Sequence, residues 1–360
     1  MGLRESLQAT APYGLAWGGL ALGVVFGALV EHTRFCAMGA VSDWHGFGDA
    51  RRLRAWLLAT AVALLGAQGL DAAGVVDLNL SMYLAPRLNW LGNVLGGLLF
   101  GIGMVFAGGC ASRNLVRLGA GDLRAAVVLV TMGVFAYMSL GGLLGPLRSG
   151  LEQATALDLP GEMNASLVSL ITLALPAPAG MVRVALILLL AGALLVYCLS
   201  DAAFRASPRL WVGGVGVGLC VCAAWALSGL AYDEFADVPL APQGLSFVRP
   251  VGDSLEYLQR YTAAPVPDFG VATVLGTVLG AGLAAWRARR FKLVGFADSG
   301  DTLRNLAGAA LMGIGGVVAM GCSIGQSVTG VSTLAAGSLL AAAALFAGGV
   351  LGLRMLERML

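Results

Sequence analysis

The sequence predicts an all-α protein that crosses a membrane several times as one polytopic transmembrane helical bundle. Three observations predict this fold class: 58% of the 360 residues are apolar, the mean hydropathy is +0.84, and only 12% of the residues are charged. Soluble domains carry about 25% charged residues, so this chain cannot cover a surface that faces water. Glycine supplies 53 residues, and small residues let membrane helices approach closely. The lipid bilayer is therefore the expected surrounding.

Charge and ligand content argue against several classes of function. The net charge is +2 without a long run of one sign, so no nucleic-acid partner is expected. The six cysteines form no C-x-x-C pair and there are only two histidines, so no metal site is predicted. No nucleotide-binding motif occurs, so neither a cofactor nor ATP hydrolysis by this chain is expected. The chain is predicted not to be an enzyme.

Nine apolar segments are long enough to cross, or nearly cross, a hydrocarbon core of about 30 Å. They cover residues 14–30, 53–71, 91–109, 122–146, 181–200, 210–230, 269–286, 302–320 and 333–353. Gly-containing polar stretches follow three of them, in RFCAMGAVSDW, GGCASRNLVRLGAGD and GCSIGQSVTGVST. Irregular backbone at membrane depth persists only where protein or a water-filled cavity satisfies its polar groups. These stretches are therefore predicted to be short broken or re-entrant helices that line a path.

The basic residues orient the chain. When alternate loops are placed on opposite sides, one side collects 15 of the 22 arginines and lysines and the other collects six, with Arg34 left ambiguous. The positive-inside rule places the richer side in the cytoplasm, so the N-terminus is predicted outside and the C-terminus inside. The two longer connections, 147–180 and 231–268, fall outside. Neither is long enough for a separate enzymatic domain, so residues 1–360 are predicted to form a single transporter domain.

An internal repeat divides this domain into two halves. GGLLFGIGMVFAGGC at residues 96–110 aligns without gaps with GAALMGIGGVVAMGC at residues 308–322, and nine of the 15 positions are identical. The first copy is predicted to run inward and the second outward. Approximately residues 14–146 and 210–353 are thus predicted to be inverted pseudo-symmetric repeats, which are typical of secondary transporters with a site near mid-membrane. A duplication kept only for packing is the alternative.

Each copy of the repeat ends in Gly-Cys followed by small and polar residues. If a half-helix restarts after each cysteine, its free N–H groups and its dipole favour an anion in the break. A thiol adds a weak donor and a polarizable sulfur, which suits a soft, sulfur-bearing anion better than a hard oxyanion or a metal cation. The residues predicted to bind the anion here are Gly109, Cys110, Ala111, Ser112, Gly321, Cys322 and Ser323. For either thiol taken alone, packing as a small hydrophobe is the alternative.

Other residues near the breaks are weighed in the same way. Cys36, in RFCAMGA after the first span, is a third candidate for the same path. Arg113 lies next to Cys110 and can attract an anion, although an arginine near a helix end more often reaches out to the membrane interface. Glu31, at the end of the first span, is interpreted as an interfacial cap or as one half of a surface pair.

The other three cysteines differ from Cys36, Cys110 and Cys322 in their sequence surroundings. Cys198, Cys220 and Cys222 lie within plain apolar runs, LLVYCLS and GVGLCVCAAW. Nothing in these runs breaks a helix, so the three residues are assigned to packing.

At RFCAMGAVSDW, AGGCASRNLVRLGAGDLRA and GIGGVVAMGCSIGQSVTGVSTLAAGS the chain resembles the YeeE/YedE family of bacterial sulfur transporters. The resemblance runs over almost the whole chain. It implies an inner-membrane protein with a periplasmic N-terminus, in which thiosulfate passes a narrow centre by contacts with cysteine thiols. Matched by motif, these are Cys36, Cys110 and Cys322. It also implies a small cytoplasmic sulfur-carrier partner of the TusA type.

Three alternatives to thiosulfate uptake stay open at this point. YedE-type members of the family are linked with selenium metabolism, so a related sulfur or selenium compound is one alternative. A membrane protein that transfers sulfane sulfur between thiols is another, but it needs paired or low-pKa thiols near a surface. A structural subunit of a larger complex is the third, and it predicts that replacing the cysteines does no harm.

Overall fold

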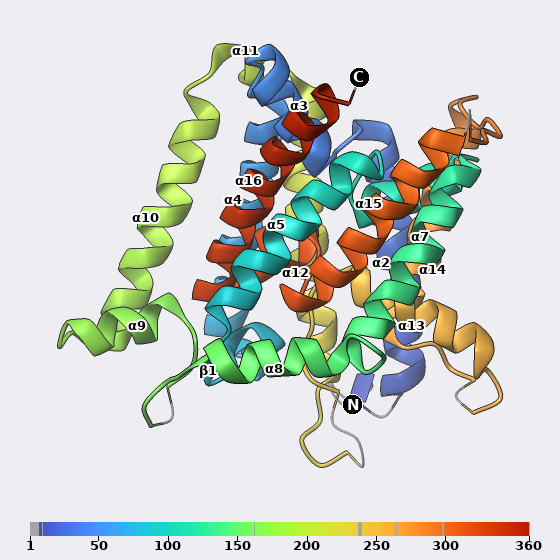
Figure 1. Cartoon of the computed structure of the whole chain (residues 1–360). Helices are drawn as coiled ribbons and strands as arrows, with labels where there is room; N and C mark the ends of the chain where they lie inside the picture. Colours follow the sequence, from blue (N-terminus) through green and yellow to red (C-terminus); the bar gives the residue numbers. More distant parts are fainter. Residues whose placement is uncertain are drawn as a thin grey trace.

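The computed structural model describes residues 7, 8, 10–161, 163–236, 240–263, 265–296 and 299–359. In this part of the chain the fold is a bundle of helices, and a two-residue strand pair joins two connecting segments (Figure 1). The all-α fold class predicted from the composition is confirmed.

The helices are α2 Ala11–Thr33, α3 Ala37–Phe47, α4 Arg51–Ala72, α5 Trp90–Phe106, α6 Ala111–Gly119, α7 Leu123–Leu140, α8 Gly145–Thr155, α9 Leu167–Ala174, α10 Ala179–Leu199, α11 Ala202–Arg205, α12 Pro208–Ala231, α13 Val248–Gln259, α14 Phe269–Arg287, α15 Ser299–Val318 and α16 Ala336–Glu357. The shorter elements are the 3-10 turns η1 Leu78–Leu80 and η2 Met82–Leu84, the π-helical segment η3 Gly325–Gly330, and the strands β1 Arg87–Leu88 and β2 Leu157–Asp158.

Eight helical segments in the described chain are long and apolar enough to cross a membrane, against nine predicted spans. The difference is the expected span 302–320, which forms α15. This helix begins with a polar turn that contains Asp301 and Arg304, so its mean hydropathy is too low for a span on its own. The expected span 122–146 also ends early, because α7 stops at Leu140 and the chain turns into α8.

Glycines set the closest helix contacts. On α5, a Cβ at Gly96 would meet the backbone of Gly315 and Ala319, whereas a Cβ at Gly103 would meet the backbone of Gly308. The partner numbers fall as the α5 numbers rise, so α5 and α15 pack against each other in antiparallel orientation. Similar glycine contacts join α2 with α14, α4 with α12, and α5 with α16. Backbone approach of this kind is how membrane helices associate without a hydrophobic drive between them.

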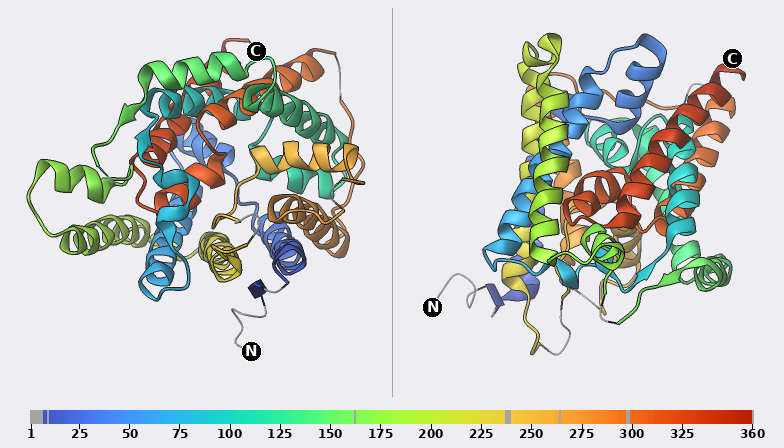
Figure 2. Two further views of the ribbon diagram at one scale, coloured as in Figure 1. Left: turned by 90° about the horizontal axis from the view of Figure 1, so that it is seen from below. Right: turned by 90° about the vertical axis from the view of Figure 1, so that its left-hand side faces the viewer.

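The bundle has two ends that differ in structure. Helices α8 and α13 and strand β1 lie at the lower end in Figure 1, here called the α13 face, and α11 and the end of α16 lie at the upper end, the α11 face. Figure 2, left, views the bundle from the α13 face, where α8 and α13 lie across the ends of the long helices. The sequence analysis predicted α8, α9 and α13 only as connections. Helix α10 stands at the edge of the bundle, and among its residues only Ala191 and Cys198 are buried.

Candidate functional site

Three cysteines begin short helices inside the bundle. Cys36 is the N-cap residue of α3 and Cys110 is the N-cap residue of α6. Cys322 directly precedes the helical residues 323–332, which include the π-helical segment η3. The restart of a helix predicted after Cys110 and Cys322 is therefore present, and the same arrangement occurs at Cys36.

The thiols lie against the first turns of these helices. The backbone N–H of Gly39 donates to Cys36 Sγ over 3.4 Å, and the N–H of Gly325 donates to Cys322 Sγ over 3.2 Å. Cys110 Sγ lies 3.4 Å from the hydroxyl oxygen of Ser112. The first N–H groups of a helix have no partner within the helix and carry a partial positive charge. Each thiol thus shares its place with donors that suit an anion.

The three breaks converge on one another. The side chains of Cys36 and Cys110 interact directly, and Cys322 is close enough to Cys110 to interact with it electrostatically. Cys110 and Cys322 are fully buried, Cys36 is partly exposed, and all three are free thiols. Segments that are 74 to 286 residues apart in the sequence are therefore joined at one place in the bundle.

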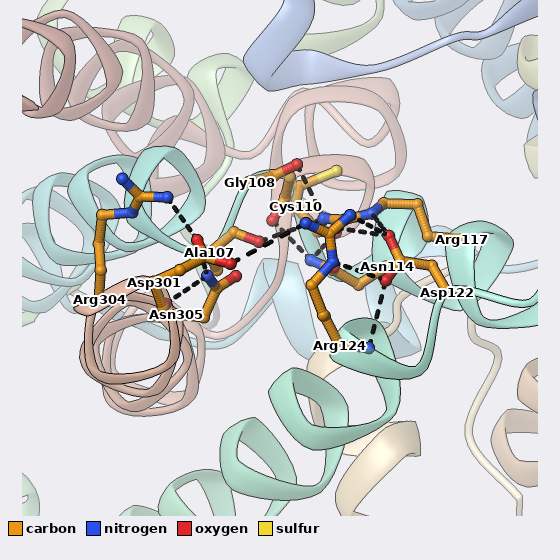
Figure 3. A network of polar contacts seen from close by, with 11 residues as sticks. Ala107, Gly108, Cys110, Asn114, Arg117, Asp122, Arg124, Asp301, Arg304 and Asn305 are labelled. Carbon is orange, nitrogen blue, oxygen red and sulfur yellow. Dashed lines mark hydrogen bonds and ion pairs between the residues drawn. The ribbon is translucent and has the colours of Figure 1, made fainter. Parts of the chain in front are cut away.

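A polar network near the α11 face stabilises the break at Cys110. Figure 3 shows this network from close by. Gly108 has a φ of 68°, a left-handed conformation in which glycine is favoured. Asn114 donates to the carbonyl of Gly109 over 2.8 Å, and Arg117 donates to the carbonyl of Gly108 over 3.1 Å. These bonds satisfy carbonyls in the turn that follows α5, which have no helical partners.

Asp122 holds Arg117 in this network. Arg117 Nη2 lies 2.8 Å from Asp122 Oδ2, and Arg124 Nε lies 2.9 Å from Asp122 Oδ1. Partial burial raises the pKa of Asp122, but the bonds from Arg124 and Arg117 outweigh it, so the pKa of this carboxyl lies below its usual value. The carboxylate is charged at neutral pH and anchors the break to the start of α7.

The break at Cys322 is built without charge. Met320 takes a left-handed φ of 60°, and the side-chain amide of Gln326 donates back to the carbonyl of Ala319. Residues 321–338 are all buried, and no charged residue occurs between Arg304 and Arg354. The second break is therefore built from a buried segment that carries no charge of its own.

The predicted site residues surround the thiols, and two of them have unsatisfied polar atoms. Ser323 is fully buried within reach of Cys110, and its hydroxyl completes no hydrogen bond of normal geometry. Arg113 packs its side chain on Gly109, where an added Cβ would lie 3.1 Å from Arg113 Cγ. Its Nη1 atom is buried without a hydrogen-bond partner. The remaining predicted positions, Ala111, Ser112 and Gly321, are buried beside Cys110 and Cys322.

Sequence reasoning missed several residues at the same place. Glu31 is not a surface cap, because only 7% of it is exposed and it lies between two arginines. Gln326 and Ser246 contact the second break, and the hydroxyl of Ser246 donates to Cys322 Sγ over 3.9 Å. The polar run after Cys322 gave a signal for Gln326, whereas nothing in the local sequence pointed to Ser246.

Two of the three cysteines assigned to packing contact carbonyls of α4. Cys198 Sγ donates to the carbonyl of Arg54 over 3.2 Å, and Cys222 Sγ donates to the carbonyl of Val62 over 3.7 Å. Both contacts join neighbouring long helices. These thiols therefore provide matched controls for the three at the breaks.

A bundle of apolar helices with a buried centre that suits an anion is typical of a multi-pass membrane transport protein. The family model described as Sulphur transport matches residues 32–351, so the chain belongs to this family. The resemblance predicted from the cysteine motifs is confirmed.

Named relatives support the same class. The chain is 30% identical over 328 residues to the thiosulfate transporter TsuA of Escherichia coli K12, and this match covers 88% of this chain and 87% of the relative. It is 28% identical over 336 residues to the thiosulfate transporter TsuA of Spirochaeta thermophila, and this match covers 91% of this chain and 94% of the relative. It is 37% identical to the probable transporter YedE of Salmonella typhimurium over 103 residues, or 28% of this chain and 23% of the relative.

Proposed function

We propose that this protein carries thiosulfate into the cell, and that the anion passes Cys322, Cys110 and Cys36 in turn. The observation that carries the proposal is the convergence of three helix starts, each with a free thiol, of which Cys110 and Cys322 are fully buried. The names of the two relatives matched over most of the chain support thiosulfate as the anion.

The chemistry of the centre fits a small anion with a soft sulfur. Helix N-termini stabilise the oxygen charge, and polarizable thiols contact the terminal sulfur of thiosulfate. The unsatisfied Ser323 hydroxyl and the buried Nη1 of Arg113 supply donors that a bound anion would satisfy. A buried polar group left without a partner costs about 1–3 kcal/mol, so satisfying it favours binding. The substrate-binding residues of the proposal are those predicted from the sequence.

We further propose that the α11 face lies in the cytoplasm and the α13 face in the periplasm. Helix α4 begins at Arg51, α12 begins at Pro208, and α14 ends at Arg287. Basic residues lie at these three helix ends, which are on the α11 face (Figure 1). The positive-inside rule supports this orientation in a bacterial inner membrane. The antiparallel packing of α5 and α15 supports the proposal that residues 14–146 and 210–353 are inverted repeats within one domain. A small sulfur carrier of the TusA type is the proposed partner at the same face, on the family resemblance alone.

The test is growth on thiosulfate of a bacterium that lacks its other thiosulfate importers. The strain is complemented by this chain with Cys36, Cys110 or Cys322 replaced by alanine, beside the controls Cys198→Ala and Cys222→Ala at matched membrane levels. We expect growth with the wild type and with the two controls only. If the wild type gives no growth, thiosulfate is the wrong substrate, and if every variant grows, the thiols do not carry the anion.

A further inference from the structure

A buried carboxylate lies between two arginines on the α11 side of the thiols. Glu31, near the end of α2, is 7% exposed. Its Oε2 lies 3.6 Å from Arg113 Nη1, and its Oε1 lies 3.7 Å from Arg290 Nη1. Both separations are longer than the 2.7–2.9 Å of a charge-assisted hydrogen bond. The carboxylate therefore offsets part of the charge of the two cations without being tightly bound to either.

Arg113 connects this cluster to the thiols. It is the third residue after Cys110, its backbone N–H lies against the Cys110 thiol, and its charge reaches the Cys36 thiol. The side-chain atom that faces Glu31 is the same buried Nη1 that has no hydrogen-bond partner. Arg113 is therefore in contact with both the Cys110 break and the carboxylate of Glu31.

The far side of the cluster opens to an arginine-lined cavity. A cavity of about 660 Å³ is lined by His32, Arg209 and Arg290, together with Pro208 and Val212. The guanidinium of Arg209 donates to the carbonyl of His32 over 2.7 Å and faces the charges of Arg34 and Arg290. Arg113, Arg290, Arg209 and Arg34 thus outnumber the carboxylate of Glu31, and the local charge favours an anion.

We propose that Arg113 and Arg290 form a second anion subsite on the cytoplasmic side of the thiols, and that Glu31 occupies this subsite until the transported anion displaces it. This inference rests on the proposed function. Glu31 acts as a positioning residue: it holds the two arginines and competes with the substrate for them. The competition lowers the positive charge of the empty subsite and speeds release when the anion has passed.

The test compares Glu31→Gln with the control Asp49→Asn, which removes a carboxylate paired with Arg51 in an exposed place near the same end of the bundle. Glutamine keeps the size of Glu31 but cannot neutralise the arginines. We expect the KM for thiosulfate uptake into vesicles to fall at least about fivefold, the lower end of typical coupling between sites. We expect the maximal rate to fall with it, because release becomes slow. The control should change neither.

A second readout does not depend on the substrate. The protein is placed in inside-out vesicles as a variant whose only thiol is Cys110. A negatively charged thiosulfonate reagent that cannot cross the membrane then modifies Cys110 from the cytoplasmic side. We expect Glu31→Gln to raise the modification rate at least about fivefold and Asp49→Asn to leave it unchanged. If Glu31→Gln fails to fold, Arg290→Gln, which removes the outer half of the subsite, should lower the modification rate instead.

The outcomes separate this proposal from the proposed function. If the wild type imports no thiosulfate, the proposed function fails, and the modification rates still decide whether the subsite exists. Equal KM values and equal modification rates in Glu31→Gln and wild type would overturn the subsite while leaving thiosulfate uptake in place. In the same way, an Arg290→Gln variant with the modification rate of the wild type would overturn it.

Discussion

The two Gly-Cys breaks share a sequence motif but are stabilised by different means. At Cys110 the end of α5 is held by Arg117, which in turn is paired with Asp122. At Cys322 the end of α15 is held by the amide of Gln326, in a stretch where residues 321–338 are all buried. The first break lies near the α11 face and uses charge, and the second uses neutral groups only.

The cost of removing charge from water explains this difference. Near a face of the bundle, a carboxylate and a guanidinium keep part of their hydration, so their pairing is favourable. Arg117 and Asp122 retain 17% and 14% of their side-chain exposure. A charge at the fully buried second break would lose several kcal/mol of hydration, so an amide replaces it there. The same motif therefore folds with either set of partners, provided that the carbonyls of the helix end are satisfied.

The largest expected effect comes from the contact that the two repeat copies share. A Cβ at Gly308 would lie 2.5 Å from the backbone nitrogen of Ala107 and 2.7 Å from the carbonyl oxygen of Gly103. Gly308→Val therefore separates α5 from α15, and we expect a loss of about 3 kcal/mol or failure to accumulate in the membrane. The measure is the thermal midpoint of the detergent-solubilised protein. Gly192→Val on α10, where a Cβ meets nothing, is the control and should shift the midpoint little.

The two ways of holding a break differ in their response to salt. Arg117→Met removes the charged partner of the first break, and Gln326→Met removes the neutral partner of the second. We expect each to cost about 2 kcal/mol. Gln326→Met leaves a buried carbonyl without its donor, and Arg117→Met leaves the partly buried carboxylate of Asp122 without one of its two arginine partners. Raising the salt concentration should shrink the difference between Arg117→Met and wild type, since screening weakens the pair with Asp122. The Gln326→Met difference should not change. Equal salt responses in thermal unfolding would contradict the comparison.

The charged break also predicts a pH dependence. The pKa of Asp122 is lowered in the folded protein, so the unfolded chain binds its proton first as the pH falls. The stability that Asp122 contributes is present above the pKa of an unperturbed aspartate, about 3.9, and is lost as the pH falls through the lower folded value. Asp122→Asn should be less stable than wild type at pH 7 and should close part of that gap below about pH 4. A constant gap would show that the charge of Asp122 does not hold the break.

The hydropathy pattern predicts the long helices well because it depends on local composition. The glycines of α5 and α15 and the cysteines that follow them also indicate the helix breaks, since Gly and small polar residues end an apolar run in a recognisable way. Helix α13 could not be found in this manner. It is short and mixes charged and polar residues with its apolar ones, so no apolar run marks it. It is helical because it packs on α7 and α14.

The partners of the site residues are the part that sequence reasoning could not reach. Glu31 is 82 residues from Arg113 and 259 residues from Arg290. Because no local pattern records a pairing over such a separation, its position at the end of a span favoured an interfacial cap. The neutral partner Gln326 follows its cysteine closely, and the sequence places it beside the break, although its bond to Ala319 depends on the left-handed turn at Met320.

The smallest expected effect concerns the hydroxyls beside the two thiols. Ser112 Oγ lies 3.4 Å from Cys110 Sγ, and Ser246 Oγ lies 3.9 Å from Cys322 Sγ. Each hydroxyl orients its thiol by a weak bond, so removing it should change the KM for thiosulfate uptake by no more than the 0.5–1.5 kcal/mol of a typical hydrogen bond, about 2- to 12-fold.

The shorter contact should matter more, so Ser112→Ala is expected to raise the KM further than Ser246→Ala. Uptake of radiolabelled thiosulfate into right-side-out vesicles measures both. Ser149→Ala is the control, because Ser149 is on α8 and its hydroxyl donates to the carbonyl of Pro146 in the same helix. A larger effect at Ser246 would mean that the anion is held mainly at the neutral break. The break at Cys110 would then serve mainly for release of the anion, together with Arg113 and Arg290.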